Sequence, residues 1–140
     1  MIFMRRIRKF LLRWWPSALC VAFILYVTLS SKPFDNVYEP SLFEGCDKII
    51  HFLMFGGLTS VMMFDYRRVA GPGRLTPMVV FLIGMLVIAY GVLDEVMQAY
   101  LTTTRTGDTL DFGADMLGIA VAALTMPPVV NQIAARFEKK

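Results

Sequence analysis

The chain has 140 residues, carries a net charge of +3 and is 56% hydrophobic, with a mean hydropathy of +0.58. A soluble core of this size cannot absorb so much apolar surface, so a bilayer must serve as solvent for much of the chain. The length fits one domain. The pI near 9.0 does not indicate nucleic-acid binding, because the basic residues flank apolar segments as determinants of membrane topology do.

Four apolar segments predict an all-α fold: a polytopic membrane protein with a bundle of four transmembrane helices. The expected spans run from Leu11 to Ser30, from Asp47 to Phe64, from Thr76 to Leu101 and from Asp108 to Val130, the last ended by Pro127-Pro128. The second span has only about 18 residues, the short end of what crosses a bilayer. Residues 65–68 are interpreted as part of a cytoplasmic turn.

The chain accordingly divides into a basic N-terminus of residues 1–10, a four-helix membrane domain of residues 11–130 and a basic tail of residues 131–140. Cys20 lies within an apolar segment and Cys46 at the boundary of another. The sequence has no CxxC or Cys/His spacing, so neither a disulfide nor a zinc site is expected. Because apolar segments continue through the chain, we interpret the first as an uncleaved anchor.

Basic residues concentrate at one end of the expected spans. Eleven of the 14 lysines and arginines lie there: Arg5, Arg6, Arg8, Lys9, Arg13, Arg67, Arg68, Arg74, Arg136, Lys139 and Lys140. The positive-inside rule therefore predicts that both termini are cytoplasmic, in a multi-pass protein of the cytoplasmic membrane. Nine of the 11 carboxylates lie at the opposite, outer end. Acidic residues contribute little to topology, so their excess at this end indicates a site.

The outer polar residues begin at the start of the second expected span. Asp47 and His51 are four residues apart and share one face of a helix, with Lys48 beside them. Asp47 can compensate the helix N-terminus, and Lys48 can extend toward the lipid headgroups. His51, the only histidine, lies about one turn inside the helix. A packing hydrogen bond between helices and a catalytic role are both open for it.

A second polar group lies late in the third expected span. Glu95 is about 9 Å inside Leu101 along the helix axis. Asp94 and Gln98 are four residues apart, and Glu95 and Gln98 three, so all can face the bundle interior. A carboxylate at this depth must be protonated or paired, so function or a buried ion pair is favoured over a simple helix end.

Three aspartates open the fourth expected span. Asp108, Asp111 and Asp115 are spaced i, i+3, i+7, which places them in one stripe along a helix. Asp108 suits an N-cap and Asp111 suits the first turn, whereas Asp115 lies two turns inside. Arg105 precedes the stripe and is the expected counter-ion, able to bind a phosphate or a carboxylate through two hydrogen bonds.

Small residues accompany the polar ones. Ala114, Gly118 and Ala122 recur every four residues in the fourth span, and Gly56 and Gly57 are adjacent in the second. Small side chains at this spacing let helix backbones approach closely in lipid, so we interpret them as packing positions.

Three ordered elements carry a family resemblance. The segments Asp47–Phe52 and Asp94–Gln98, followed by Arg105, Asp111 and Gly118, resemble the DKxxHF, DExxQ and R…D…G elements of the VanZ-like family. The resemblance covers roughly residues 47–123. It implies a polytopic protein of the bacterial inner membrane with a role in the cell envelope. Some members are linked to resistance to teicoplanin, a glycopeptide, and the resemblance implies no known reaction.

Three classes of function are open for the outer polar residues. In the favoured class they bind the headgroup of a cell-envelope component, such as a lipid-linked or peptidoglycan-related precursor, with Arg105 and Lys48 on phosphate. In the second class the protein is an intramembrane hydrolase or transferase, in which either His51 with Glu95, Asp111 and Asp115 ligates a divalent metal or Glu95 serves as general base. Its catalytic candidates are His51, Glu95 and Asp111. In the third class the residues form an ion-pair network that holds the helices while a partner docks.

The expected binding residues are those that gather at the outer ends of the spans. They are Asp47, Lys48, His51, Glu95, Gln98, Arg105, Asp108, Asp111 and Asp115. The expected partners are the lipid bilayer and a lipid-linked envelope precursor, and nucleic acid is not expected. No cofactor is assigned, and no metal site is assigned because no HExxH or similar signature is present. A closed, desolvated cluster favours the third class, and an outward-open cavity the first two.

Overall fold

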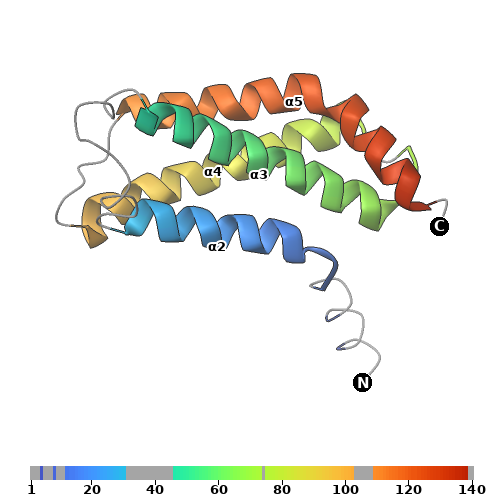
Figure 1. Ribbon diagram of the computed structural model, residues 1–140, viewed down its shortest axis with the longest axis horizontal. Helices are drawn as coiled ribbons and strands as arrows, with labels where there is room; N and C mark the ends of the chain where they lie inside the picture. Colours follow the sequence, from blue (N-terminus) through green and yellow to red (C-terminus); the bar gives the residue numbers. More distant parts are fainter. Residues whose placement is uncertain are drawn as a thin grey trace.

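The computed structural model describes residues 4, 8, 12–30, 46–73, 75–102 and 109–138. Within these residues the chain forms four helices and no strand: α2 (Trp15–Leu29), α3 (Cys46–Ala70), α4 (Pro77–Leu101) and α5 (Thr109–Glu138). The prediction of an all-α fold is therefore confirmed. Successive helices alternate in direction, so α2 begins and α5 ends at the same end of the bundle (Figure 1).

Three of these helices, α3, α4 and α5, are long and apolar enough to cross a membrane. The remaining helix, α2, is also apolar, but its 15 residues make it shorter than the expected segment from Leu11 to Ser30. At 1.5 Å per residue α2 extends about 22 Å, against about 30 Å for the hydrocarbon core of a bilayer. Trp14 and Pro16 mark its start, because proline is well accommodated in the first turn of a helix.

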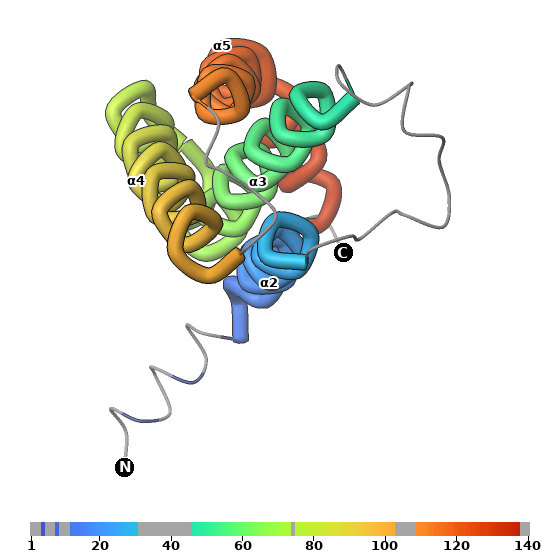
Figure 2. The backbone as a smooth tube through the Cα atoms, turned by 90° about the vertical axis from the view of Figure 1, so that its left-hand side faces the viewer, coloured from blue at the N-terminus to red at the C-terminus, as the bar shows by residue number. Residues whose placement is uncertain are grey.

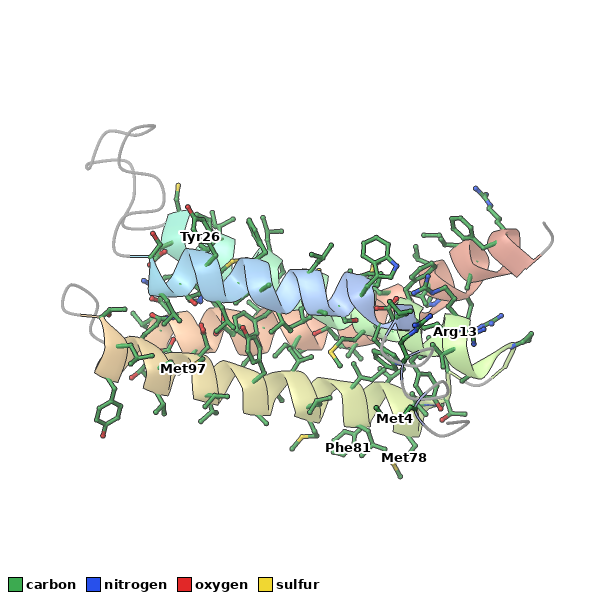
Figure 3. All side chains as sticks on the ribbon, turned by 90° about the horizontal axis from the view of Figure 1, so that it is seen from below. Met4, Arg13, Tyr26, Met78, Phe81 and Met97 are labelled. Atoms are coloured by element: carbon green, nitrogen blue, oxygen red, sulfur yellow. The ribbon has the colours of Figure 1, made fainter. Side chains whose placement is uncertain are left out.

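The outer surface of the bundle is apolar, and its interior contains many polar side chains. On α4, Met78 and Phe81 are 65% and 61% exposed, and Figure 3 shows both pointing away from the other helices. The buried polar and charged side chains are Ser17, Thr28, His51, Thr59, Asp65, Arg67, Asp94, Gln98, Asp111 and Asp115. This distribution is the reverse of that in a soluble protein and is the one expected when lipid surrounds the helices.

The closest helix pair is α3 with α5, and α3 also contacts α2 and α4 (Figure 2). Gly118 of α5 lies against the backbone of α3, where an added Cβ would collide with the Phe52 carbonyl oxygen. A Cβ at Gly56 would lie 3.0 Å from the Gly118 carbonyl oxygen. The expected packing role of Gly118 and Gly56 is confirmed, because only the absence of a Cβ permits this approach.

The helix α3 is longer than expected, and the prediction that it ends at Phe64 is wrong. It continues to Ala70, so residues 65–68 are helical rather than a turn. The sequence suggested a turn because these residues are charged, but the bundle buries two of them. Asp65 accepts hydrogen bonds from Ser17 N at 3.0 Å and Ser17 Oγ at 2.7 Å, and Arg67 Nε donates to Asn131 Oδ1 at 3.1 Å.

The helix α5 also passes its predicted end. Pro127-Pro128 lie inside it, and it continues to Glu138, through residues expected as a tail. Proline removes a backbone donor and commonly bends a helix, and Figure 1 shows a bend in the red part of α5. Val130 and Ala134, beyond the prolines, are buried. Packing of these last turns against the bundle explains why the prolines bend the helix without ending it.

Candidate functional site

The polar residues expected at the outer ends lie where α2 and α4 end and α3 and α5 begin. There, His51 Nδ1 of α3 lies 2.9 Å from Asp115 Oδ1 of α5, and both side chains are 1% exposed. His51 and Asp115 are 64 residues apart in the chain. Arg67 and Asn131, which form a hydrogen bond near the opposite end of the two helices, have the same separation. The parallel α3–α5 pair thus keeps one alignment along its length, and this alignment places His51 on Asp115.

Aromatic packing orients the His51 ring. Phe55, one turn further along α3, stacks on it with an interplanar angle of 4° and a centroid distance of 6.4 Å. Phe55 is itself fully buried and stacks on Tyr90 of α4. Gly91 makes room for Phe55, since a Cβ there would lie 3.2 Å from Phe55 Cε1. An ionised Asp115 can only accept, in which case the ring donates Nδ1–H to it, whereas a protonated Asp115 donates to Nδ1.

Glu95 lies apart from Asp94 and Gln98, in the wall of a pocket between α4 and α5. The pocket has a volume of about 370 Å³, and its lining is mainly apolar: Val92, Val96, Ala99 and Tyr100 of α4, with Phe112 of α5. Glu95 Oε1 is buried and accepts no hydrogen bond from the described residues. The end of the bundle where α3 and α5 begin therefore has a mostly apolar pocket with one carboxylate in its wall.

Asp47 and Asp111 lie close together at the start of α3 and α5, next to His51. Lys48 Nζ is 3.6 Å from Asp111 Oδ1, within ion-pair range. Asp47, His51 and Asp111 each have an oxygen or ring nitrogen within 4.8 Å of the other two. The first-turn positions of Asp47 and Asp111 suit carboxylates, because a helix N-terminus carries partial positive charge.

Asp94 and Gln98 have a structural role in the described residues. Asp94 Oδ1 accepts from Thr28 Oγ1 at 2.8 Å, and Asp94 Oδ2 accepts from Gln98 Nε2 at 3.0 Å. The Thr28 bond joins the last turn of α2 to α4, and the Gln98 bond lies within α4. Gln98, expected as a binding residue, does not line the pocket and instead holds Asp94 in place.

The ligand atoms of His51, Glu95 and Asp115 also lie within 4.8 Å of one another. Asp115 Oδ2, like Glu95 Oε1, is buried without a hydrogen-bond partner among the described residues. No lysine or arginine in the described part of the chain lies within ion-pair range of Glu95 or Asp115. This group can hold a proton or a cation, and it unites a nitrogen ligand with two oxygen ligands.

Of the nine expected binding residues, the structure brings five together in two overlapping groups: Asp47, His51, Glu95, Asp111 and Asp115. Lys48 joins them through Asp111. Arg105 and Asp108 lie outside the described residues. The sequence analysis missed Thr28, which was inconspicuous as one polar residue in an apolar span, and it missed the Ser17–Asp65 contact at the opposite end.

Comparisons with known proteins found no matching family model, no similar curated protein and no similar solved structure. The geometry of the chain itself must therefore carry any proposal about function.

Proposed function

We propose that this chain is a multi-pass protein of the bacterial inner membrane, related to the VanZ-like family, that binds a lipid-linked component of the cell envelope. In this proposal α2 crosses the membrane together with α3, α4 and α5, which makes four spans. Both termini are cytoplasmic, and the end of the bundle with His51 and Glu95 faces outward. The distribution of basic residues supports the orientation, because 11 of 14 flank the opposite end.

The observation that carries the proposal is the pocket between α4 and α5. Its apolar walls, made by Val92, Val96 and Phe112, suit the hydrocarbon chain of an amphiphile. The pocket lies on helices long enough to cross a membrane, so a lipid can enter it from the bilayer. Glu95 gives the same pocket one polar contact, beside His51 and Asp115. Apolar walls next to a polar group match a molecule with a tail and a headgroup.

The charges indicate which headgroup fits. Glu95 Oε1, in the pocket wall, lacks a hydrogen-bond donor among the described residues, and the amines and hydroxyls of a sugar–peptide headgroup are donors. Lys48 and, by the sequence pattern, Arg105 supply positive charge for the phosphates that link such a headgroup to its lipid. A headgroup with phosphates alone would be repelled by the carboxylates. We therefore favour a precursor that carries amine or sugar groups.

Photocrosslinking tests the proposal directly. A photoreactive residue at Val96, in the pocket wall, is compared with one at Phe81, which is also exposed on α4 but outside the pocket. The probe is a polyprenyl-linked sugar–peptide, and polyprenyl phosphate is the second ligand. We expect the sugar–peptide lipid to crosslink in excess at Val96 and Glu95→Gln to reduce that excess. Equal crosslinking at both positions would refute binding in the pocket.

A second candidate function is an intramembrane hydrolase or transferase. The observation that favours it is the His51–Asp115 contact of 2.9 Å, because a carboxylate that holds an imidazole by Nδ1 leaves Nε2 to accept a proton from a nucleophile. Release of phosphate from a polyprenyl diphosphate by the purified protein tests this candidate. Turnover that persists in a His51→Ala variant would exclude His51 as the base.

A further inference from the structure

We propose that His51, Glu95 and Asp115 bind one divalent transition-metal ion at the end of the bundle where α3 and α5 begin. The site rests only on side chains of the chain itself, and it shares Glu95 with the pocket of the proposed function. These three residues come from α3, α4 and α5, so an ion here joins the three long helices.

The separations of the ligand atoms fit a single ion. All three lie within 4.8 Å of one another, and two ligands with bonds of about 2.1 Å to one ion are at most about 4.2 Å apart, so a closure of about 0.6 Å or less brings the three onto one ion. His51 Nδ1 and Asp115 Oδ1 are 2.9 Å apart, close to the roughly 3.0 Å that separates neighbouring ligands at 90° on such an ion. A cation can therefore replace the proton between these two atoms with little movement.

Unsatisfied oxygens provide the second argument. Asp115 is 1% exposed, yet its Oδ2 has no hydrogen-bond partner in the described residues, and the same holds for Glu95 Oε1. A buried carboxylate oxygen without a donor destabilises the fold, and more so when it is charged. A metal ion bound by both carboxylates offsets their two negative charges, and it satisfies both oxygens when Asp115 binds through Oδ1 and Oδ2 together.

The neighbouring group of Asp47, His51 and Asp111 is the weaker candidate. Lys48 Nζ lies 3.6 Å from Asp111 Oδ1 and already supplies a positive charge there. Lys48 reaches neither Glu95 nor Asp115 within ion-pair range in the described part of the chain. The group of His51, Glu95 and Asp115 therefore needs a cation more.

The ligand set indicates the kind of ion. One imidazole nitrogen with two carboxylate oxygens suits Mn²⁺ or Zn²⁺ better than Mg²⁺ or Ca²⁺, which prefer oxygen ligands alone. Mn²⁺ is the more useful probe because it is paramagnetic, so pulsed electron paramagnetic resonance can detect coupling to a directly bound imidazole nitrogen.

In the test, the purified full chain is first stripped of metal with a chelator and held in phosphatidylcholine nanodiscs. Mn²⁺ alone is then titrated into it, and empty nanodiscs serve as the blank. We expect one bound Mn²⁺ per chain with ¹⁴N coupling, and loss of that coupling in His51→Ala. Glu95→Gln and Asp115→Asn should each weaken binding by at least about tenfold. The control Asp65→Asn, which alters a buried carboxylate at the opposite end, should bind Mn²⁺ as the wild type does.

Three results would overturn the site: no saturable Mn²⁺ binding, bound Mn²⁺ without ¹⁴N coupling, or unchanged affinity in Glu95→Gln. Glu95 has no hydrogen bond through Oε1 that Gln would break, so this variant should fold even where His51→Ala or Asp115→Asn does not. In that case the ¹⁴N coupling of Mn²⁺ in the wild type and the Mn²⁺ affinity of Glu95→Gln are enough to decide whether the site exists. Failure of lipid crosslinking at Val96 with normal Mn²⁺ binding would refute the proposed function and leave the metal site standing.

Discussion

His51 and Asp115 are 64 residues apart in the chain, yet His51 Nδ1 lies 2.9 Å from Asp115 Oδ1 in the interior of the bundle. Both side chains are 1% exposed, so the contact replaces water at His51 Nδ1 and at Asp115 Oδ1. The pair therefore links α3 to α5 by a hydrogen bond whose partners cannot be replaced by solvent.

Removing either partner of this pair should destabilise the bundle. We expect Asp115→Ala and His51→Ala each to lower the free energy of unfolding by about 2–4 kcal/mol, because each leaves a buried polar group behind. The double variant should lose less than the sum of the two, with a coupling energy on the order of 1 kcal/mol or more. Denaturation of the detergent-solubilised protein measures all three. Strict additivity would show that the contact contributes nothing.

Glycine at position 118 should be required for the approach of α5 to α3. Gly118→Ala places a methyl group against the Phe52 carbonyl oxygen, so the helices must separate, at a cost of about 1–3 kcal/mol. The matched control is Gly57→Ala, since an added Cβ at Gly57 meets nothing within 4 Å. That variant should be neutral or slightly stabilised, because alanine favours helix. Equal thermal stability of the two variants would contradict the close contact.

Hydropathy was sufficient to predict the helices, but their ends were harder to predict. Both prediction errors lie at one end of the bundle, at residues 65–70 of α3 and beyond Pro127 of α5. Charge and proline usually mark helix ends, and here neither does. Asp65 is buried by a contact with Ser17, 48 residues away, and such a partner cannot be read from local sequence.

The candidate site could be predicted only in part, because local spacing shows which residues share a helix face but not which helices meet. Helical spacing put Asp47 with His51 and Asp111 with Asp115 on shared faces, and the structure keeps these pairs together at one end. The spacing could not supply the register between helices, which decides that His51 meets Asp115. It also could not separate Glu95, in the pocket wall, from Asp94, which accepts hydrogen bonds from Thr28 and Gln98.

Asp65 should be important for the start of α2. The residue before this helix, Trp14, makes no side-chain cap, and Asp65 of α3 instead accepts from the Ser17 backbone N–H. Asp65→Ala should therefore lower the free energy of unfolding by about 2–4 kcal/mol, since it removes a helix cap and also the partner of Arg68. Ser17→Ala, which removes only the hydroxyl bond, should cost about 1 kcal/mol. A smaller loss for Asp65→Ala than for Ser17→Ala would refute the capping role.

The proposed topology makes a prediction about accessibility. In a background with Cys20 and Cys46 replaced by serine, single cysteines are placed at Asn36, Gly73 and Thr103. A membrane-impermeant thiol reagent applied to intact cells should label Asn36→Cys and Thr103→Cys. It should label Gly73→Cys only after the membrane is opened, because Gly73 lies at the end with the basic residues. The reverse pattern would invert the orientation.

The last prediction separates Glu95 from its neighbour Asp94. Asp94 accepts one hydrogen bond from Thr28 of α2 and one from Gln98 within α4, so Asp94→Asn should lower the free energy of unfolding by about 1–3 kcal/mol. Glu95 Oε1 is buried without a hydrogen bond in the described residues, so Glu95→Gln removes charge without breaking a contact there. Its stability should be unchanged or higher, because an uncompensated buried charge is costly.

Function should respond in the opposite order. Glu95 lies in the pocket wall and Asp94 does not, so Glu95→Gln should reduce lipid crosslinking at Val96 while Asp94→Asn retains it below its melting temperature. Crosslinking and thermal unfolding are measured on the same preparations. If Glu95→Gln were strongly destabilised and Asp94→Asn were not, Glu95 would be the structural carboxylate. Glu95 would then no longer count as the polar contact of the pocket, and the proposal that the pocket binds a lipid-linked headgroup would lose its main support.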